Sequence, residues 1–411
     1  MKKKSENIGP KIYIFTFGCA SRYLDGEKFK NFFIQNNYEI TNKIEDADFI
    51  LLNTCAFRKK EEDIAIERLI EFGKRKKKNA EVIVAGCLPA INKERMDKVF
   101  KGKNFSPKEL SKINDFFEHN IKIEDIPDVN SYKFHRPKSF IEVIKTLPKV
   151  NKTALLKRTF QYAKAKILQN IIADEVDKQF FIRIANGCLG NCSYCAIKFG
   201  IGNLKSKPFD KIKTEIETLL KKNGKICITL TGDDTAAYGG DINTSFAELL
   251  NRIIEYPNIK KIDIEEINIQ WLVKDYERLK SILVNPKFNR LWLALQSGSE
   301  KILKSMNRPI LEIPKNTAIK LASLKKAAPN LIYRGQFIVG FPGETLEDME
   351  LTLNHIIDSK FDEVNLFKFD AKPNTKAKSM TDQISDKEKN RRIKHMSLKL
   401  KKHKIKILTN N

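Results

Sequence analysis

Three apolar runs near the start of the chain each lead into a cysteine. Their residues favour β-strands, and they are Lys11–Phe17 before Cys19, Ala47–Asn53 before Cys55, and Glu81–Ala85 before Cys87. Helix-like stretches at Gly26–Asn36 and Lys59–Lys78 separate the runs, so the pattern is βαβαβ and predicts a parallel sheet. Because the carboxyl ends of parallel strands lie along one edge of a sheet, we expect the three cysteines to converge there.

A second series of βα units begins at Phe180. The predicted strands are Phe180–Ile184, Ile226–Thr231, Lys261–Glu265, Leu291–Leu295, Ile332–Val339 and Glu363–Phe369. Helical patterns separate these six strands, which indicates a partial (β/α)6 barrel of the TIM type, because a full barrel needs about 250 residues. The expected fold class is therefore α/β, with an N-terminal βαβ parallel-sheet domain followed by a partial barrel.

The expected domain organisation has four parts. They are an N-terminal domain at 1–103, a basic linker at 104–179, the barrel at 180–380 and a basic helical tail at 381–411. Between Ser131 and Ala173 the linker is rich in Lys and Arg, and Glu142 is its single acidic residue. It is either an exposed arm or a simple spacer.

Net charge and cysteine content limit which partners and which cellular compartment the sequence suggests. The 411 residues carry 76 Lys and Arg against 51 Asp and Glu, a formal net charge of +25. Such an excess favours phosphate-rich partners such as nucleic acid, although a Lys-rich composition with a solvated surface would give the same value. No apolar stretch follows the basic start, and no window suits a membrane span, so we expect a cytoplasmic protein. In that compartment the seven cysteines indicate metal binding or catalysis rather than disulfides.

Three cysteines in one short loop carry the strongest chemical signal. Cys188, Cys192 and Cys195 have the spacing C-x3-C-x2-C, which lets three thiolates hold three irons of a [4Fe–4S] cluster and leaves the fourth iron open. Structural zinc is the alternative, but it needs four closed ligands, and no second cysteine pair is present. Cys227 lies inside an apolar run, where we expect a small buried side chain rather than a ligand.

Tyr194 precedes the third cysteine of this loop, and the whole loop resembles the signature of the radical S-adenosylmethionine (SAM) superfamily. The segments Thr16–Cys19, Asn53–Cys55 and Ala85–Cys87 resemble the three-cysteine domain of the methylthiotransferases. Later segments resemble further blocks of that family in the same order: Gly202–Ser206, Leu230–Gly239, Leu295–Ser299 and Val339–Glu344. The resemblance spans about Lys11 to Met380 and is strongest near the branch that modifies threonylcarbamoyladenosine in tRNA.

The resemblance implies two [4Fe–4S] clusters and SAM. The auxiliary cluster would be bound by Cys19, Cys55 and Cys87, and the radical SAM cluster by Cys188, Cys192 and Cys195. In the family one SAM methylates a sulfur atom at the auxiliary cluster, another generates the radical, and the substrate carbon couples to the methylthio group. A reductant such as flavodoxin or ferredoxin and a sulfur donor are the implied partners.

SAM contacts are also implied by the resemblance. The candidate residues are Tyr194, Gly232, Asp233, Asp234, Gln296, Ser297 and Gly340. Each has a structural alternative: Asp233 and Asp234 suit a turn at a strand end, Gln296 and Ser297 a βα loop, and Gly340 a Gly/Pro turn.

The chain departs from the family pattern where the substrate is expected. The family's third-strand arginine is replaced by Asp263, the following Asn-Pro reads Asn268-Ile269, the acidic residue before the Gly-Phe-Pro-Gly block is Gln336, and Arg-Pro-Gly-Thr reads Lys372–Thr375. The stretch after Met380 is too short for the family's C-terminal TRAM domain. The predicted activity is therefore methylthiolation of an unactivated C–H carbon, with a modified tRNA adenosine as substrate. The alternatives are a peptide or protein side chain, or a non-catalytic iron–sulfur RNA-binding or redox protein.

Overall fold

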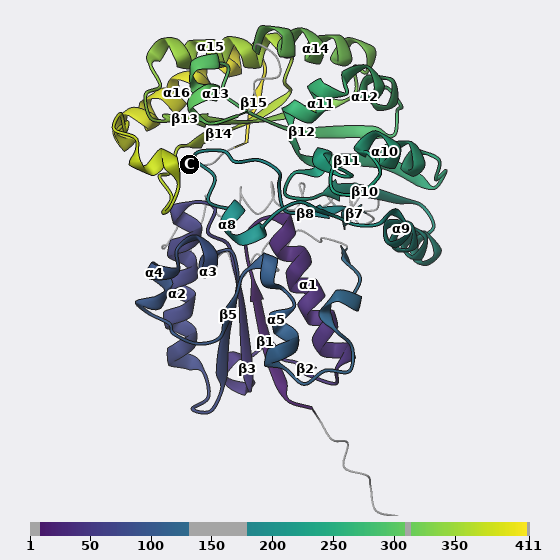
Figure 1. Ribbon diagram of the computed structural model, residues 1–411, viewed down its shortest axis with the longest axis vertical. Coiled ribbons are helices and arrows are strands. Elements are labelled where there is room, and N and C mark those ends of the chain that lie inside the picture. The colour runs from purple at the N-terminus through teal and green to yellow at the C-terminus, as the bar shows by residue number, and fades with distance from the viewer. Residues whose placement is uncertain (1–8, 131–178, 309–313, 409–411) are drawn as a thin grey trace, which may run out of the picture.

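The computed structural model describes residues 9–130, 179–308 and 314–408. Two α/β parts lie one above the other in Figure 1. The N-terminal part has a parallel sheet in the order β2-β1-β3-β4-β5. Its elements are β1 (Lys11–Thr16), α1 (Ala20–Gln35), β2 (Glu39–Ile40), β3 (Phe49–Thr54), α2 (Lys59–Arg75), β4 (Glu81–Gly86), α3 (Leu88–Ile91), α4 (Lys93–Asp97), β5 (Asn104–Phe105) and α5 (Lys112–Phe116).

Both faces of this sheet are covered, which explains why its strands are apolar throughout. Successive strand residues point to opposite faces. On one face Leu51 and Ile83 pack in a core with Phe29, Phe32 and Phe33 of α1. On the other face a second core joins strand residues to α2, and it includes Ile50, Leu52, Val82, Val84, Leu69 and Phe72. The predicted strands and the parallel sheet are confirmed.

The second part is an open barrel with strand order β15-β14-β13-β12-β11-β10-β7-β6. Its strands are β6 (Val129–Asn130), β7 (Gln179–Arg183), β10 (Ile226–Thr231), β11 (Ile259–Asn268), β12 (Phe288–Gln296), β13 (Ile332–Val339), β14 (Glu363–Lys368) and β15 (Lys406–Ile407). The pairs from β7 to β15 are parallel, and β6 is an antiparallel edge strand. All six predicted strands are present, and β15 is a seventh parallel strand that the sequence analysis missed.

Helices cover the outer face of the barrel, where its main apolar core lies. They are α9 (Phe209–Asn223), α10 (Phe246–Ile254), α11 (Ile269–Lys274), α12 (Tyr276–Leu283), α13 (Glu300–Ser305), α14 (Pro314–Ala327), α15 (Leu346–Asp358) and α16 (Asp386–Lys402). The short helix α8 (Lys198–Ile201) instead packs against the N-terminal part. A two-stranded hairpin of β8 (Ala185–Asn186) and β9 (Lys205–Ser206) frames the C-x3-C-x2-C loop.

Buried contacts join the two parts. Arg183 of β7 lies 2.8 Å from Asp25 of α1 and donates to the carbonyl of Ser21. Lys372, after β14, lies 2.6 Å from Glu62 of α2. Both pairs are almost fully buried, so the barrel and the N-terminal sheet share one interior.

The C-terminal segment contains the helix that its sequence predicts. Ile393, Met396 and Leu400 of α16 belong to the barrel core, and β15 pairs with β14. The part of the predicted linker that the structure describes, from Asn104 to Asn130, includes Phe105, Ile113 and Ile123 of the N-terminal core. The rest of the linker, at 131–178, lies outside the described residues.

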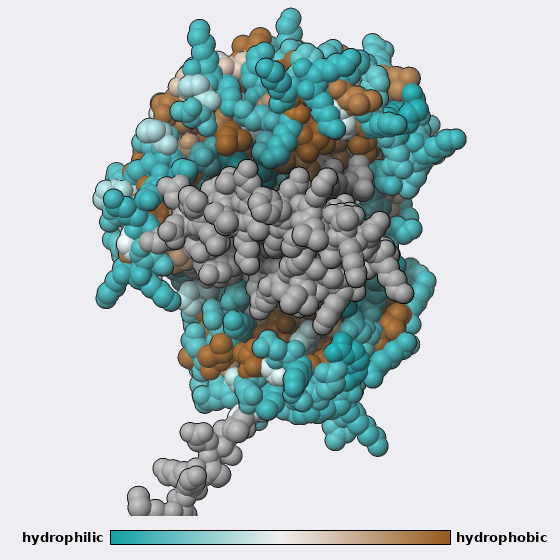
Figure 2. Space-filling model, turned by 180° about the vertical axis from the view of Figure 1, so that it is seen from behind, coloured by the Kyte–Doolittle hydropathy of each residue, from teal (hydrophilic) through white to brown (hydrophobic). Residues whose placement is uncertain are grey.

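The described surface gives no sign of a membrane segment. None of the described helices combines the length and apolar character needed to cross a bilayer. Figure 2 shows that, outside the grey atoms, hydrophilic residues cover most of one face of the molecule.

Candidate active site

The first three cysteines follow the carboxyl ends of β1, β3 and β4, as the sequence predicts. Cys55 and Cys87 are buried, whereas Cys19 keeps an exposed side. The backbone N–H of Cys87 donates to the carbonyl of Thr54 at 2.9 Å, which ties the second and third strand ends together. Gly18 has a φ of +128°, and a Cβ at this position would lie 2.5 Å from Cys55 Cβ. The approach of the first strand end to the second therefore requires glycine.

Burial keeps these thiols protonated when nothing is bound. It raises the pKa of Cys55 to about 12 and raises the pKa of Cys87 even further. The thiolate is the form that binds metal, so an electropositive ligand is needed to displace the protons.

Orphaned polar atoms surround this first trio of cysteines. Thr16 Oγ1 and Asn53 Oδ1 are buried and lack a hydrogen-bond partner among the described residues. Arg22, in the first turn of α1, is only 3% exposed, and its Nε and Nη1 also lack acceptors within the described chain. Buried polar groups are normally satisfied, so this concentration of orphans marks a place built for a polar group.

The second trio lies on the loop after β8. The backbone N–H of Gly190 donates to Cys188 Sγ at 3.1 Å, and a Cβ on Gly190 would lie 3.2 Å from Cys188 Sγ and 3.8 Å from Cys192 Sγ. The loop thus wraps tightly around two of its sulfur atoms. Arg308 Nη1 lies 3.9 Å from Cys192 Sγ, which places a positive charge beside the trio.

Asp233 and Asp234 lie beside the second trio at the end of β10. Asp234 is 2% exposed; its Oδ2 accepts hydrogen bonds from Trp271 Nε1 at 2.9 Å and from Cys188 Sγ at 3.5 Å, while its Oδ1 has no partner within the described residues. Burial raises the pKa of Asp234. Asp233 accepts the N–H of Gly187 at 2.8 Å. The structure therefore brings both aspartates to the cysteine loop, with an unsatisfied oxygen available there.

Tyr194 and Gly232 lie near the same loop. The Tyr194 hydroxyl is 3.5 Å from Arg308 Nη1, and its ring packs edge-on against Phe341. A Cβ at Gly232 would lie 3.0 Å from the carbonyl oxygen of Ala185, so a side chain would be crowded against the start of the loop.

Two of the three remaining predicted SAM residues, Ser297 and Gly340, have protein partners. Gln296 ends β12 with a φ of +73°. The Ser297 hydroxyl lies 3.2 Å from Thr352 Oγ1 of α15. Gly340 donates its N–H to Glu344 at 3.0 Å, and a Cβ there would lie 2.3 Å from Lys389 Cγ of α16. Gly340 is therefore covered by the C-terminal helix rather than gathered with the aspartates.

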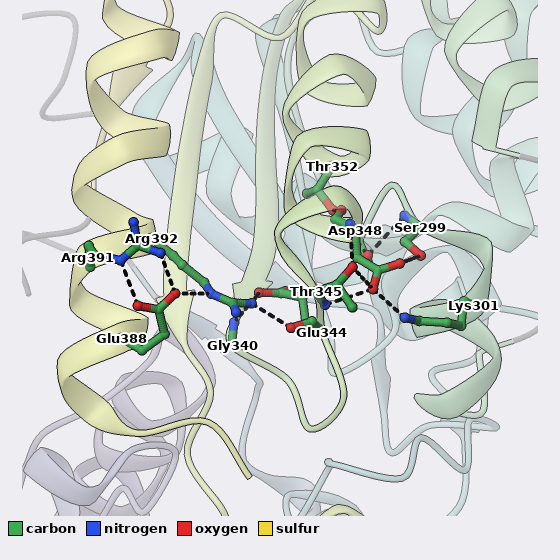
Figure 3. Close-up of polar contacts among 11 residues, drawn as sticks. Ser299, Lys301, Gly340, Glu344, Thr345, Asp348, Thr352, Glu388, Arg391 and Arg392 are labelled. Atoms are coloured by element: carbon green, nitrogen blue, oxygen red, sulfur yellow. Dashed lines mark hydrogen bonds and ion pairs between the residues drawn. The ribbon is translucent and has the colours of Figure 1, made fainter. Parts of the chain in front are cut away.

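Figure 3 shows how α16 is fixed over this turn. Arg392 lies 2.8 Å from Glu344, whose carboxylate also accepts the N–H of Gly340, and Glu388 lies 2.9 Å from Arg392. Asp348, on the right of the figure, joins Ser299 and Lys301 to the start of α15. The C-terminal helix thus supports the loop after β13, whereas α15 supports the loop after β12.

Two neighbouring glutamates lie on β11 of the barrel. Burial raises the pKa of Glu265 to about 8 and that of Glu266 to about 6. Gln336 donates to Glu266 at 3.0 Å. Burial raises the pKa of the Cys19 thiol, and the carboxylates of Asp233 and Glu266 act in the same direction. A Cβ on Gly200 of α8 would lie 4.0 Å from Cys87 Cα, so the helix that follows the second trio packs directly against the first.

Neither trio gathers around a single point. Among the described residues, no three His, Cys, Asp or Glu side chains lie close enough to hold one metal ion. A tetrahedral zinc site would need such a group. A four-iron cluster would instead be bound with each of three thiolates on a different iron.

Comparisons with known proteins extend this picture. Residues 11–105 match the family described as "Uncharacterized protein family UPF0004", and residues 182–356 match the radical SAM superfamily. A "Probable threonylcarbamoyladenosine tRNA methylthiotransferase" of Methanocaldococcus jannaschii is 31% identical over 93% of this chain and 81% of its own length. The chain belongs to the radical SAM methylthiotransferase family. It is accordingly a radical SAM methylthiotransferase enzyme, and membership of the family implies [4Fe–4S] clusters and SAM.

Other methylthiotransferases are similar to a comparable degree. A "tRNA-2-methylthio-N(6)-dimethylallyladenosine synthase" of Dictyoglomus thermophilum is 30% identical over 93% of this chain and 80% of the relative. A "Ribosomal protein uS12 methylthiotransferase RimO" of Chlamydia pneumoniae is 28% identical over 94% and 76%. In structure, the radical SAM methyltransferase TsrM of Kitasatospora setae has a TM-score of 0.58 at 11% identity, covering 90% of this chain and 77% of TsrM. That likeness concerns the fold alone.

Sequence reasoning missed three residues of this methylthiotransferase site. Arg22, Trp271 and Arg308 all reach the cysteines or Asp234. Trp271 lies in α11, directly after β11, and could have been noticed as an aromatic in the segment that follows a predicted strand. Nothing local distinguishes Arg22 or Arg308 from the chain's many surface basic residues.

Proposed function

We propose that this enzyme methylthiolates a modified adenosine in tRNA and holds two [4Fe–4S] clusters. Cys19, Cys55 and Cys87 would bind the auxiliary cluster, and the C-x3-C-x2-C loop would bind the radical SAM cluster. The observation that carries the proposal is the packing of the helix after the second trio against the first trio: a Cβ on Gly200 of α8 would lie 4.0 Å from Cys87 Cα. A substrate between the two trios would therefore be within reach of both.

The chain's own residues supply binding and shielding. When bound, the clusters and SAM would supply a radical and a methylated sulfur atom. Burial of Cys55 and Cys87 excludes water from the auxiliary side. Asp234, with one unsatisfied oxygen, is the best-placed acceptor for the amine or ribose hydroxyls of SAM. Arg308 balances charge at Cys192. A reductant of the flavodoxin or ferredoxin type and a sulfur donor complete the proposed set of partners.

The tRNA substrate is supported by charge and by similarity. A net charge of +25 favours a polyanion, because each phosphate contact releases counterions. Relatives at 30–31% identity are named for action on tRNA adenosine derivatives. The proposed target is therefore a tRNA base that already carries an N6 substituent.

A peptide side chain is the second candidate. Asp263 and Glu266 on β11 add acidic groups to the barrel, which oppose phosphate and would suit a basic peptide. One relative is named for action on a ribosomal protein.

Incubation with substrates distinguishes the two candidates. The enzyme is reconstituted anaerobically with iron and sulfide, reduced, and incubated with SAM and total tRNA, and digested nucleosides are analysed by mass spectrometry. A methylthio increment on an adenosine is expected. Cleavage of SAM without an increment in tRNA, but with one in ribosomal protein, would transfer the proposal to the peptide class. No SAM cleavage at all would favour a non-catalytic protein.

Iron counting tests the two-cluster arrangement separately. Two clusters of four irons give about eight irons per chain. A variant with Cys188, Cys192 and Cys195 changed to Ala should retain about four. Loss of all iron in this variant would show that the N-terminal trio does not hold a cluster by itself.

A further inference from the structure

The guanidinium of Arg22 is buried beside the first cysteine trio without a full set of partners. Its side chain is 3% exposed. Nη1 lies 2.7 Å from Asp25 Oδ2, but the contact does not have hydrogen-bond geometry, and both Nε and Nη1 lack an acceptor in the part of the chain that the structure describes. Arginine always carries its charge, so this is a buried cation with unused N–H groups.

The surroundings keep Arg22 charged and close to the sulfur atoms. Burial alone would lower its pKa, yet the neighbouring Asp25 carboxylate outweighs burial and raises it. The backbone N–H of Arg22 donates to the carbonyl of Cys19 at 3.0 Å, and its Cγ would lie 3.3 Å from a Cβ on Gly18. The side chain is therefore packed against the turn that carries the first cysteine.

Asp25 is not a partner of Arg22 only, because it also pairs with Arg183. Its other carboxylate oxygen, Oδ1, lies 2.8 Å from Nη2 of Arg183, which also faces Asp128 at 3.4 Å. Arg22 and Arg183 thus share Asp25, and Nε and Nη1 of Arg22 are left without an acceptor among the described residues. Buried donors are normally satisfied, so an anionic acceptor is expected beside this guanidinium when the enzyme is assembled.

A cluster bound by three thiolates and carrying sulfur at its open iron is such an anion. Hydrogen bonds to cluster sulfur and the local net charge are among the factors that set the reduction potential of iron–sulfur clusters. We propose that Arg22 is a positioning residue of the auxiliary cluster, which donates hydrogen bonds to its sulfur and balances its negative charge. This inference rests on the proposed function, since it requires a cluster on Cys19, Cys55 and Cys87.

The test compares reduction potentials in the full-length, reconstituted enzyme. Clusters are titrated electrochemically and followed by electron paramagnetic resonance, with iron counted in each sample. The auxiliary wave is identified as the one that disappears when Cys19, Cys55 and Cys87 are changed to Ala. Arg22→Met removes charge and donors, and Arg22→Lys keeps the charge but not the planar fork. Arg183→Met is the control, because it disturbs the same buried network from the other side of Asp25.

Arg22→Met is expected to move the auxiliary wave to lower potential, because the reduced cluster carries more negative charge. The radical SAM wave should stay in place, Arg22→Lys should shift the auxiliary wave less, and Arg183→Met should leave it unchanged. Loss of about four irons in Arg22→Met that is restored in Arg22→Lys would also support the role.

Two results would overturn the inference while leaving the proposed function intact. One is an unmoved auxiliary wave in Arg22→Met with about eight irons retained. The other is an equal shift, or equal iron loss, in Arg22→Met and Arg183→Met, since that would reflect disturbed packing. A wild-type enzyme with about four irons and no auxiliary wave would instead contradict the proposed function.

Discussion

Gly18→Ala should remove the auxiliary cluster selectively. The new Cβ would lie 2.5 Å from Cys55 Cβ and 3.2 Å from its Sγ. Carbon atoms in contact lie about 3.5–4.0 Å apart, so Cys55 has to retreat by about 1 Å. Metal sites tolerate displacements of only about 0.2 Å. The φ of +128° adds a conformational cost of about 1–3 kcal/mol, because alanine rarely adopts it.

The assay is iron and sulfide content after anaerobic reconstitution. Gly18→Ala should hold about four irons where the wild type holds about eight. It should still cleave SAM but form no methylthio product. Gly73→Ala is the matched control: Gly73 lies in α2 with no atom within 4 Å of the added Cβ, so iron should be unchanged and stability should rise by about 0.5–1 kcal/mol. Full iron content in Gly18→Ala would refute the reasoning that this turn fixes Cys55.

Three further variants test other parts of the structure. Lys372→Met removes the nearest cation of the buried Glu62 carboxylate, at a cost to the free energy of unfolding of about 3–5 kcal/mol. The melting temperature should therefore fall by about 3–6 °C. Adding Glu62→Gln should recover part of this loss in melting temperature, whereas additive losses from the two substitutions would argue against a Lys372–Glu62 ion pair. Burial raises the pKa of Glu265 from its usual 4.5 to about 8 in the folded protein. Between these two pH values the folded state binds this proton and the unfolded state does not, so the free energy of unfolding falls as pH rises from 4.5 to 8. In Glu265→Gln this pH-dependent loss of stability should be smaller by a few kcal/mol, as measured by melting curves from acid to mildly alkaline pH. The same pH dependence in the variant and the wild type would contradict the raised pKa of Glu265. Cys227→Ala should leave the iron content unchanged, because Cys227 lies within β10, and any loss of iron would reveal a seventh ligand.

Much of the fold follows from local patterns. Long apolar runs predict β1, β3, β4 and six barrel strands, because strands buried on both faces must be apolar throughout. The short strand β15 escaped prediction, since Lys406 and Ile407 acquire strand geometry only by pairing with Glu363 and Val364 of β14. Two residues in a basic tail carry no periodicity of their own.

The site could be predicted only where the spacing of residues along the sequence indicates their chemistry. Strand ends placed the first cysteine trio, and the C-x3-C-x2-C spacing identified the second. The proposed role of Arg22 depends on the direction in which α1 points its side chain and on its partner Asp25. Asp25 also pairs with Arg183, which lies more than 150 positions further along the sequence. Gly340 belongs to a recognisable Gly/Pro block, but its contact with Lys389 could not be predicted, because Lys389 lies on α16, a helix outside that block.

The packing of α8 has a consequence for how substrate reaches the enzyme. This helix starts three residues after Cys195, and Ala196 and Phe199 pack with Cys87 and Leu88 in the N-terminal core. One continuous apolar contact therefore holds a cysteine of each trio in place, so the described residues fix the separation between the two cysteine trios. A substrate that reacts at both proposed clusters would have to present its reactive carbon between them, as an extended or flipped group.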